Sequence, residues 1–471
     1  MGNPKAFITI PRKDAGYRPI LERIYDFGEV EQTLNREDRK LQASRCMDCG
    51  IPFCHWACPL GNRMPEWQDL IYKGKWKEGV EVLHETNNFP DFTGRICPAP
   101  CEKSCVLALN DAPVTIRENE AAVTEVAFIE GLIKSRPPKI RTGKTVAVIG
   151  SGPAGLAVAD QLNKKGHTVT VFEKDASIGG LLRYGIPNFK LNKNIIDRRL
   201  KLMEEEGVIF RPNTEIGKDI SGKKIVNNFD AVCIAIGAGH PRDINPKGRD
   251  LKGIYFAMEF LSQQNQLIMG EKTTAPELIS AKDKHVLVIG GGDTGSDCVG
   301  TSIRQGATKI TQIEILPQPP ERKNPAMPWP NPFPNILKTS SSHEEGCERY
   351  WSLNTLEFKG TNGQVNEVIV EEVEWKKDES GKMLMISTGK QRTIKADLVF
   401  LSLGFVHPVK EGLLTELGVE LDTRGNVAVN NQKQSNLTKV FATGDAVMGA
   451  SLVVKAIADG RKVAENINKT I

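Results

Sequence analysis

Seven of the ten cysteines in this 471-residue chain lie in two short groups whose spacing suits metal–sulfur chemistry. Four occur in "CMDCGIPFCHWACP" and three in "CPAPCEKSC". The first group reads C-x2-C-x4-C-x3-C-P, close to the bacterial ferredoxin run C-x2-C-x2-C-x3-C-P, whose fourth cysteine ligates the other of two clusters. By that pattern Cys58 serves a second cluster, apart from the three cysteines before it. The seven thiols are Cys46, Cys49, Cys54, Cys58, Cys97, Cys101 and Cys105.

Two four-iron clusters need eight ligands, so the last three thiols must be shared between the clusters and an eighth ligand is still required. Structural zinc is the alternative, but two closed tetrahedral sites also need eight ligands. The two dinucleotide-binding turns described below indicate a redox protein and therefore favour iron–sulfur over zinc. The remaining cysteines, Cys233, Cys298 and Cys347, are scattered and are interpreted as small buried apolar residues.

The composition is that of a soluble globular protein, with 39% hydrophobic residues, 25% charged residues and a formal net charge of +4. This near-neutral balance predicts no nucleic-acid partner. The first residues lack the apolar run of a signal peptide, and no window reaches the roughly 18 apolar residues of a membrane helix. We therefore expect a cytoplasmic protein with no membrane contact, where thiols stay reduced and disulfides are disfavoured.

A glycine-rich turn in the middle of the chain predicts a dinucleotide site. "GSGPAG" follows the apolar strand "TVAVIG" and precedes a helical stretch. In G-x-G-x-x-G the three glycines serve a tight turn, close approach of a pyrophosphate and close helix–strand packing. The next strand, "HTVTVFEK", ends in an acid that can accept hydrogen bonds from a ribose diol. The candidate contacts are Gly150, Gly152, Pro153, Ala154, Gly155 and Glu173.

A second turn of the same pattern, "GGGDTG", follows the strand "HVLVIG". A chance glycine-rich turn is the alternative, but the repeated strand–turn–helix context favours a second dinucleotide site. Its next strand, "KITQIEIL", contains the matching acid. The candidate contacts are Gly290, Gly292, Asp293, Thr294, Gly295 and Glu314.

The elements that position these turns form one nucleotide-binding unit that occurs twice. Strands are expected at 145–150 and 285–290, and a later matching pair at 229–239 and 396–405. The first 138 residues show no strand pattern. There we expect a helix–turn–helix over 64–87, broken at Gly74, and a helix over 117–133. The fold class is therefore α/β, with two Rossmann-like domains preceded by a mainly helical iron–sulfur domain.

Two dinucleotide sites in one chain suggest a flavin and a nicotinamide, between which a hydride can pass. The C-terminal stretch "VFATGDAVMGASLVV" resembles the second FAD motif of flavoprotein reductases with two dinucleotide domains, in which the acid holds the ribityl chain. The alternative is a plain turn with a helix N-cap. This resemblance assigns FAD to the first turn and NAD(P)H to the second. Further candidate contacts are Gly180, Leu181, Lys190, Gly237, Gly404, Gly444 and Asp445.

The changes of pattern along the chain divide it into four segments. Residues 1–138 form the helical cluster domain, and 139–255 and 431–471 form two parts of the FAD-binding domain. Residues 256–430 form an inserted NAD(P)H-binding domain. A basic, proline-bearing linker, "SRPPKIRTGK", marks the first boundary.

The whole chain resembles the small (beta) subunit family of glutamate synthase, and dihydropyrimidine dehydrogenase carries a similar module. The resemblance covers the cysteine groups, "VAVIGSGPAGL", "GGLLRYGIPNFKL", "GGGDTGSDCVGTSIRQGA", "LPQPPERKNPAMPWP" and "ATGDAVMGASLVVKAI". It implies two ligand sets, with a Gln or Glu as the eighth ligand. Glu120 is the best match, Glu118 is a rival, and a solvated helix position is the plain alternative. The implied sets are Cys46, Cys49, Cys54 and Cys105, and Cys58, Cys97, Cys101 and Glu120.

The resemblance also implies a function. NAD(P)H would reduce FAD, and the clusters would pass single electrons to a large (alpha) subunit that makes glutamate from glutamine and 2-oxoglutarate. This chemistry requires no side-chain acid or base, so no catalytic residue is assigned. The alternatives are a reductase serving another acceptor, pyrimidine or ferredoxin-linked, and an electron-transfer module without turnover.

The choice of nicotinamide depends on residues after the second strand of the second unit. A carboxylate there accepts from the ribose 2′-hydroxyl and repels a 2′-phosphate, so Glu314 favours NADH. Three basic residues, Arg304, Arg322 and Lys323, could instead reach a 2′-phosphate. Arg322 is the main candidate, because similar proteins place an arginine there. The sequence therefore leaves NAD(P)H open, with a slight preference for NADH.

Overall fold

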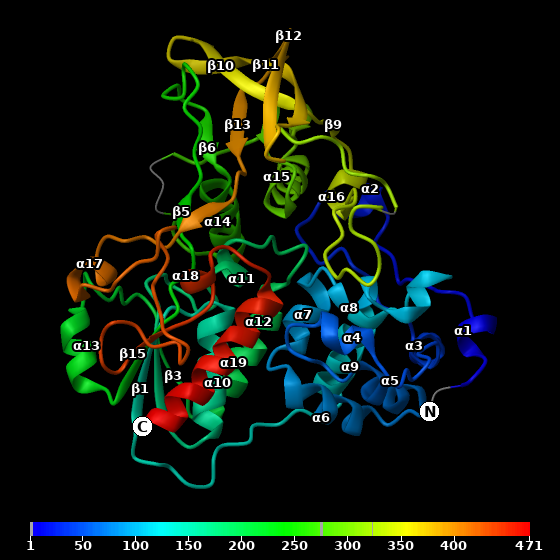
Figure 1. Cartoon of the computed structure of the whole chain (residues 1–471), viewed down its shortest axis with the longest axis vertical. Coiled ribbons are helices and arrows are strands. Elements are labelled where there is room, and N and C mark those ends of the chain that lie inside the picture. The colour runs from blue at the N-terminus through cyan, green and yellow to red at the C-terminus, as the bar shows by residue number, and fades with distance from the viewer. Residues whose placement is uncertain (1–2, 274–276, 323) are drawn as a thin grey trace.

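The computed structural model describes residues 3–273, 277–322 and 324–471. In the N-terminal domain, the described part of residues 1–138 contains helices and no extended strand (Figure 1). The predicted helix–turn–helix is confirmed, with Gly74 at φ +73° in the turn. The helices are α1 Ala6–Thr9, α2 Ile20–Arg23, α3 Arg36–Ser44, α4 Phe53–Ala57, α5 Met64–Tyr72, α6 Trp76–Thr86, α7 Pro90–Ile96, α8 Pro100–Lys103, η1 Val106–Leu109 and α9 Ile116–Ile129.

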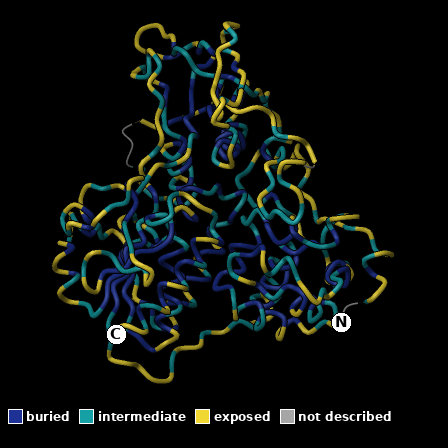
Figure 2. Tube along the Cα trace, in the orientation of Figure 1, coloured by how far each residue is buried: buried dark blue, intermediate teal, exposed yellow. Residues whose placement is uncertain are grey.

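The first Rossmann-like unit has a parallel sheet of order β15-β4-β1-β2-β3. Its central strands are buried because helices cover the sheet, as their apolar sequences predict (Figure 2). The strands are β1 Thr145–Ile149, β2 Thr168–Phe172, β3 Ile209–Arg211, β4 Ala231–Ile234 and β15 Val440–Ala442. The helices are α10 Pro153–Lys164, α11 Leu181–Tyr184, α12 Lys193–Glu205, α13 Gly222–Asn228, α17 Leu413–Leu417, α18 Asp445–Met448 and α19 Val453–Thr470.

The second unit has a parallel sheet of order β6-β13-β7-β8-β9, and the chain then returns to the first sheet through β15. The second unit is thus inserted within the first, and the predicted α/β fold class is confirmed. Its strands are β6 Ile254–Phe256, β7 His285–Ile289, β8 Lys309–Ile313, β9 Glu348–Tyr350 and β13 Leu398–Leu401. Its helices are α14 Ala257–Met269, α15 Asp293–Arg304 and α16 Ser341–Glu344.

Two smaller sheets were not predicted. An antiparallel sheet of β10 (Leu353–Thr361), β11 (Gln364–Lys377) and β12 (Met383–Lys395) projects from the second unit, and much of β12 is exposed (Figures 1 and 2). A two-stranded sheet of β5 (His240–Pro241) and β14 (Phe405–His407) lies where the chain crosses between the units. Within the described residues, no helix combines the length and the apolar character that crossing a membrane requires.

Candidate cofactor sites

The three glycines of the first turn have the separate roles that a dinucleotide-binding turn requires. Gly150 has φ +103°, and a Cβ there would lie 2.4 Å from the carbonyl oxygen of Ala235. A Cβ on Gly155 would lie 2.1 Å from the carbonyl oxygen of Gly150. Gly152, at the N-cap of α10, has no heavy atom within 4 Å of such a Cβ. Two glycines therefore permit tight packing, and Gly152 leaves the helix end open to a phosphate.

The second turn repeats this arrangement in the other unit. A Cβ on Gly290 would lie 2.4 Å from the carbonyl oxygen of Ser402, and one on Gly295 would lie 2.3 Å from that of Gly290. Gly292, at the N-cap of α15, again faces open space. The geometry therefore provides two helix ends, each able to receive a pyrophosphate.

The acid after the second strand of each unit binds the turn of that unit. Glu173 Oε2 accepts hydrogen bonds from the Ser151 amide (3.1 Å) and hydroxyl (2.5 Å), and burial raises the pKa of this carboxyl. Glu314 Oε2 accepts from the Gly291 amide at 2.7 Å. The positions that the sequence assigned to ribose recognition are thus beside the turns.

Two more segments meet the first turn. Gly180 has φ +51°, and a Cβ there would lie 2.9 Å from the Cα of Gly152. Gly444 has φ +66°, and its Cβ would lie 2.7 Å from that of Ala154. Asp445 begins α18, and burial raises its pKa. The structure therefore brings together three segments that are distant in the sequence around the N-terminus of α10, with Leu181 following directly at the start of α11.

Asp459 of α19 supports this arrangement and was not predicted. Its buried carboxylate accepts from the Gly444 amide and the Thr443 hydroxyl, both at 2.9 Å, and it pairs with Lys433. It therefore fixes the turn that carries Asp445. Its only sequence signal is an acid on the face of an amphipathic helix, which does not distinguish it from other acids.

The other predicted contacts lie at the edges of these sites. Thr294 and Gly404 line one hollow of about 210 Å³ beside the second turn, whereas Gly237 follows β4 of the first unit. Lys190 pairs with Asp297 of α15 and so joins the two units. Burial acts to lower the pKa of Lys190, but the Asp297 carboxylate outweighs this effect and the pKa is raised.

The basic candidates for a 2′-phosphate differ in availability. Arg304 is fully engaged, because it makes two hydrogen bonds to Glu345 (2.6 and 3.0 Å) and lies over the ring of Phe189. Its role is structural, and the suggestion that it reaches a phosphate is wrong. Arg322 is exposed. A further basic residue, Lys338, has its ammonium 4.0 Å from the Asp293 carboxylate at the start of α15. Lys323 lies outside the described residues.

All ten cysteines are free thiols, and four of them line one small cavity in the helical domain. Burial raises the pKa of Cys46 to about 12 and also raises the pKa of Cys54, and the neighbouring Cys105 adds to both shifts. The cavity is otherwise walled mainly by apolar side chains, including Phe53 and Met64. The four thiols are Cys46, Cys49, Cys54 and Cys105, the set that the family resemblance implied.

The other three thiols, Cys58, Cys97 and Cys101, each interact electrostatically with Glu120. Burial raises the pKa of Cys58 to about 11 and that of Cys97 to about 12, and the Glu120 carboxylate contributes to both shifts. Burial also raises the pKa of Cys101, and the charges of Cys58, Cys97 and Glu120 add to this shift. Within the described chain, no three His, Cys, Asp or Glu side chains gather closely enough to hold a single metal ion.

Glu120 is buried, with 6% exposure, so its interpretation as a solvated helix residue is wrong. It accepts hydrogen bonds from the side-chain Nδ2 of Asn87 (3.2 Å) and the hydroxyl of Thr93, and burial raises its pKa to about 8. Such a buried carboxyl, close enough to influence the pKa of three thiols, can serve as an oxygen ligand.

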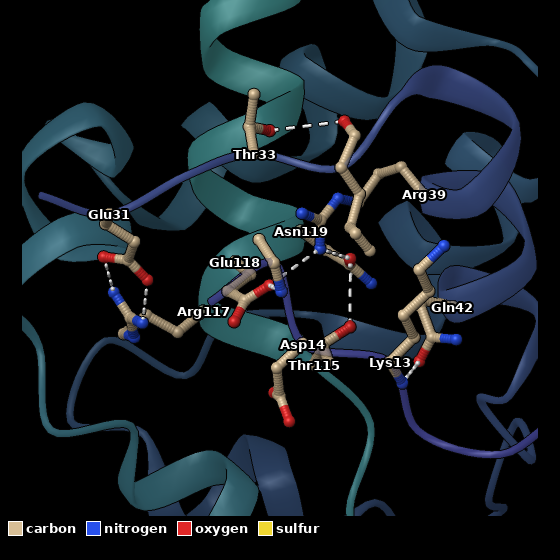
Figure 3. A network of polar contacts seen from close by, with 12 residues as sticks. Lys13, Asp14, Glu31, Thr33, Arg39, Gln42, Thr115, Arg117, Glu118 and Asn119 are labelled. Atoms are coloured by element: carbon tan, nitrogen blue, oxygen red, sulfur yellow. Dashed lines mark hydrogen bonds and ion pairs between the residues drawn. The ribbon is translucent and has the colours of Figure 1, made fainter. Parts of the chain in front are cut away.

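Glu118 is instead part of a polar network that fixes α9 against the N-terminal segment (Figure 3). Its carboxylate accepts from the Ala15 amide (3.1 Å) and from Arg39 (3.3 Å). Arg117 donates to Glu31 in the same network. Glu118 and Glu120 of α9 thus lie in different surroundings and bind different partners.

Comparison with known proteins agrees with this geometry. Residues 23–132 match the family described as dihydropyrimidine dehydrogenase domain II, 4Fe-4S cluster. Residues 144–328 and 344–460 match the pyridine nucleotide-disulphide oxidoreductase family. A solved structure of Mycobacterium tuberculosis FprA in complex with NADPH shares the fold, with a TM-score of 0.53 at 19% identity over 71% of this chain and 84% of FprA.

Curated relatives match over the full length. The chain is 48% identical to the glutamate synthase (NADPH) small chain of Mycobacterium tuberculosis, covering 100% of this chain and 96% of the relative. The corresponding small chain of Bacillus subtilis is 43% identical, with 100% and 98% covered. The glutamate synthase (NADH) of Schizosaccharomyces pombe is 41% identical over 98% of this chain, which spans 22% of that protein. The chain therefore belongs to the glutamate synthase small chain family.

Proposed function

We propose that this chain is the electron-input subunit of a glutamate synthase. It oxidises NAD(P)H at FAD and passes electrons through two four-iron clusters to a large subunit that makes glutamate from glutamine and 2-oxoglutarate. The observation that carries the proposal is the presence of two dinucleotide cradles and two separate ligand groups in one chain. Full-length similarity to small chains of glutamate synthase supports the same function.

The first cradle fits FAD. The N-terminus of α10 at Gly152 would receive the pyrophosphate, and Glu173 would accept from a ribose. The α18 N-terminus and Asp445 meet the same site from the other end of the chain. Bound there, FAD supplies the conversion between hydride and single-electron transfer.

The second cradle fits the nicotinamide nucleotide. Gly292 leaves the α15 N-terminus open to a pyrophosphate, and Glu314 lies beside the turn for ribose recognition. The hollow lined by Thr294 and Gly404 extends the site toward the crossing between the two units. The ion pair between Lys190 and Asp297 connects the two units.

The two ligand groups fit four-iron clusters better than zinc. Zinc draws four thiolates around one ion, whereas each thiolate of a four-iron cluster binds a different iron and the thiols stay further apart. Four thiols around one cavity, without a compact three-ligand group among the described residues, suit the cluster. Glu120 completes the second group as its fourth member.

The partner and the location follow from the same proposal. The fungal relative contains this module as 22% of its length, which supports a large partner for the chain when it is separate. Ten free thiols suit the reducing cytosol. We propose a cluster domain over residues 1–138 and an FAD-binding domain in two parts, 139–255 and 431–471. The nicotinamide-binding domain, 256–430, is inserted between these parts.

An anaerobic purification with a co-expressed large subunit tests the proposal. We expect bound FAD, acid-labile sulfide, dye reduction by NAD(P)H in the chain alone, and glutamate formation only when both subunits are present. If the chain instead binds a different redox enzyme and no glutamine-hydrolysing partner, its electron acceptor is not the glutamate synthase large subunit. If flavin-loaded protein does not reduce a dye with NAD(P)H, the chain is an electron-transfer module without turnover of its own.

A further inference from the structure

A long loop of the second unit reaches the helical domain. It runs from the end of β8 to the start of α16 and has no helix or strand among its described residues. Loops of this length inside a compact fold are uncommon unless they serve a function. The segment includes "LPQPPERKNPAMPWP", of which the nucleotide site uses only the part around Arg322.

The end of this segment contacts both chain segments that carry the four cysteines of the cavity. The ring of Trp329 packs on Phe53, with 4.8 Å between ring centroids. The carbonyl oxygen of the next residue, Pro330, accepts a hydrogen bond of 2.7 Å from the hydroxyl of Ser104. Figure 1 shows the loop descending from the second unit beside α4 and α8.

Each of these contacts lies one residue from a cysteine of the same cavity. Phe53 precedes Cys54 and itself lines the cavity, and the fully buried Ser104 precedes Cys105. The two cysteines belong to the two separate cysteine groups of the sequence. Two consecutive loop residues therefore connect them from outside the domain.

We propose that Trp329 and Pro330 form a clamp, supplied by the nicotinamide-binding unit, that holds the Cys54 and Cys105 segments together and retains the first cluster. This inference rests on the proposed function. Both residues act as positioning residues, because they touch the ligand-bearing segments and not the cavity. Mutation of groups that orient metal ligands typically lowers metal affinity about 10- to 100-fold.

The test follows iron release from the anaerobically purified full chain into a ferrous chelator, together with loss of cluster absorbance. In Trp329→Ala, we expect half of the iron, the share of one of two clusters, to be released about three- to tenfold faster, the range that an aromatic contact of this kind can produce. The other half should be released at the wild-type rate. Trp329→Phe, which keeps a ring on Phe53, should restore slow release.

A matched control lies on the same loop. The ring of Phe333 packs against Lys455 of α19, 4.7 Å from the Lys455 ammonium, so Phe333→Ala should release iron like the wild type. Ser104→Ala removes the donor to Pro330 and should accelerate the same half of the iron as Trp329→Ala.

Two outcomes would overturn the clamp. One is an unchanged release rate in both Trp329→Ala and Ser104→Ala. The other is equal acceleration of both halves of the iron, which would indicate general loosening of the fold. Wild-type chain without iron or labile sulfide would instead overturn the proposed function, so the two failures are distinguishable.

Discussion

The side chain of Glu314 accepts a hydrogen bond of 2.7 Å from the backbone amide of Gly291. This bond joins the end of β8 to the glycine turn after β7 and holds a negative charge beside the place where a nucleotide ribose is expected. The family includes proteins named for NADPH and for NADH. The charge at this position should therefore influence which nucleotide is used.

Replacing Glu314 with Gln tests this influence. The amide oxygen of Gln can still accept from Gly291, while the negative charge that repels a 2′-phosphate is lost. We expect the ratio of kcat/KM for NADPH to that for NADH to rise about tenfold, a change worth roughly 1.4 kcal/mol. Steady-state kinetics with both nucleotides measure it. Arg322→Ala should move the ratio in the opposite direction, and a ratio unchanged in both variants would exclude these residues from the choice.

Gly152→Val and Gly292→Val form a matched pair. A Cβ at either position would meet no protein atom within 4 Å, and both residues have extended backbone angles, so the fold should tolerate the change. Each valine should nevertheless block one pyrophosphate. We expect Gly152→Val to yield flavin-poor protein, and Gly292→Val to keep its flavin but bind nicotinamide nucleotide weakly. Flavin absorbance and nucleotide titration distinguish them, and full flavin content in Gly152→Val would contradict the assignment.

Asp445→Ala should weaken flavin binding less than Gly152→Val. The aspartate contributes one contact from the C-terminal segment, whereas the valine obstructs the whole cradle. Flavin dissociation constants of the two variants measure the difference. Equal or reversed effects would place the aspartate at the centre of the site.

Glu120→Ala should remove one ligand from the second thiol group and leave the first group intact. We expect loss of about half of the labile iron, the share of one of two clusters. Iron and sulfide analysis with cluster spectroscopy measure it, and Glu120→Gln should retain more iron because an oxygen ligand remains. Glu118→Ala is the control, since Glu118 binds Ala15 and Arg39 and not the thiols. Complete cluster content in Glu120→Ala would remove the carboxylate from the ligand set.

Lys193 should make stability depend on pH. Its ammonium is buried and donates to the carbonyls of Leu182 and Ile186, and burial lowers its pKa to about 7. In the unfolded chain the pKa is about 10.4, so between these values the unfolded state binds a proton that the native state lacks. The free energy of unfolding should therefore rise with pH in this range.

The measurement compares denaturation midpoints of the wild type and Lys193→Met at about pH 7 and about pH 10. The wild type should gain stability relative to the variant as the pH rises. Lys201→Met is the control, because Lys201 is exposed on the same helix. Parallel pH profiles for the wild type and Lys193→Met would show that Lys193 does not carry this effect.

Some features of the protein were predictable from short stretches of sequence. The strands β1 and β7, their glycine turns and the acids Glu173 and Glu314 depend on hydrophobic runs and on glycine conformations that a few consecutive residues determine. The spacing of the first cysteine group is likewise local. The projecting β10–β12 sheet was missed, because much of β12 is exposed and lacks the alternation that marks a half-buried strand.

Other features depended on contacts between distant residues. Glu118 and Glu120 are two positions apart on one helix, and only packing placed Glu120 where it affects the pKa of Cys58 and Glu118 beside Arg39. Arg304 has the residue type of a phosphate contact, but in the folded chain it is engaged by Glu345 and Phe189. Trp329 lies on Phe53 because the inserted unit folds back onto the helical domain. Residue type and spacing thus determined which chemistry is present, whereas the packing of separate chain segments decided which side chains meet, since no local pattern encodes a contact between them.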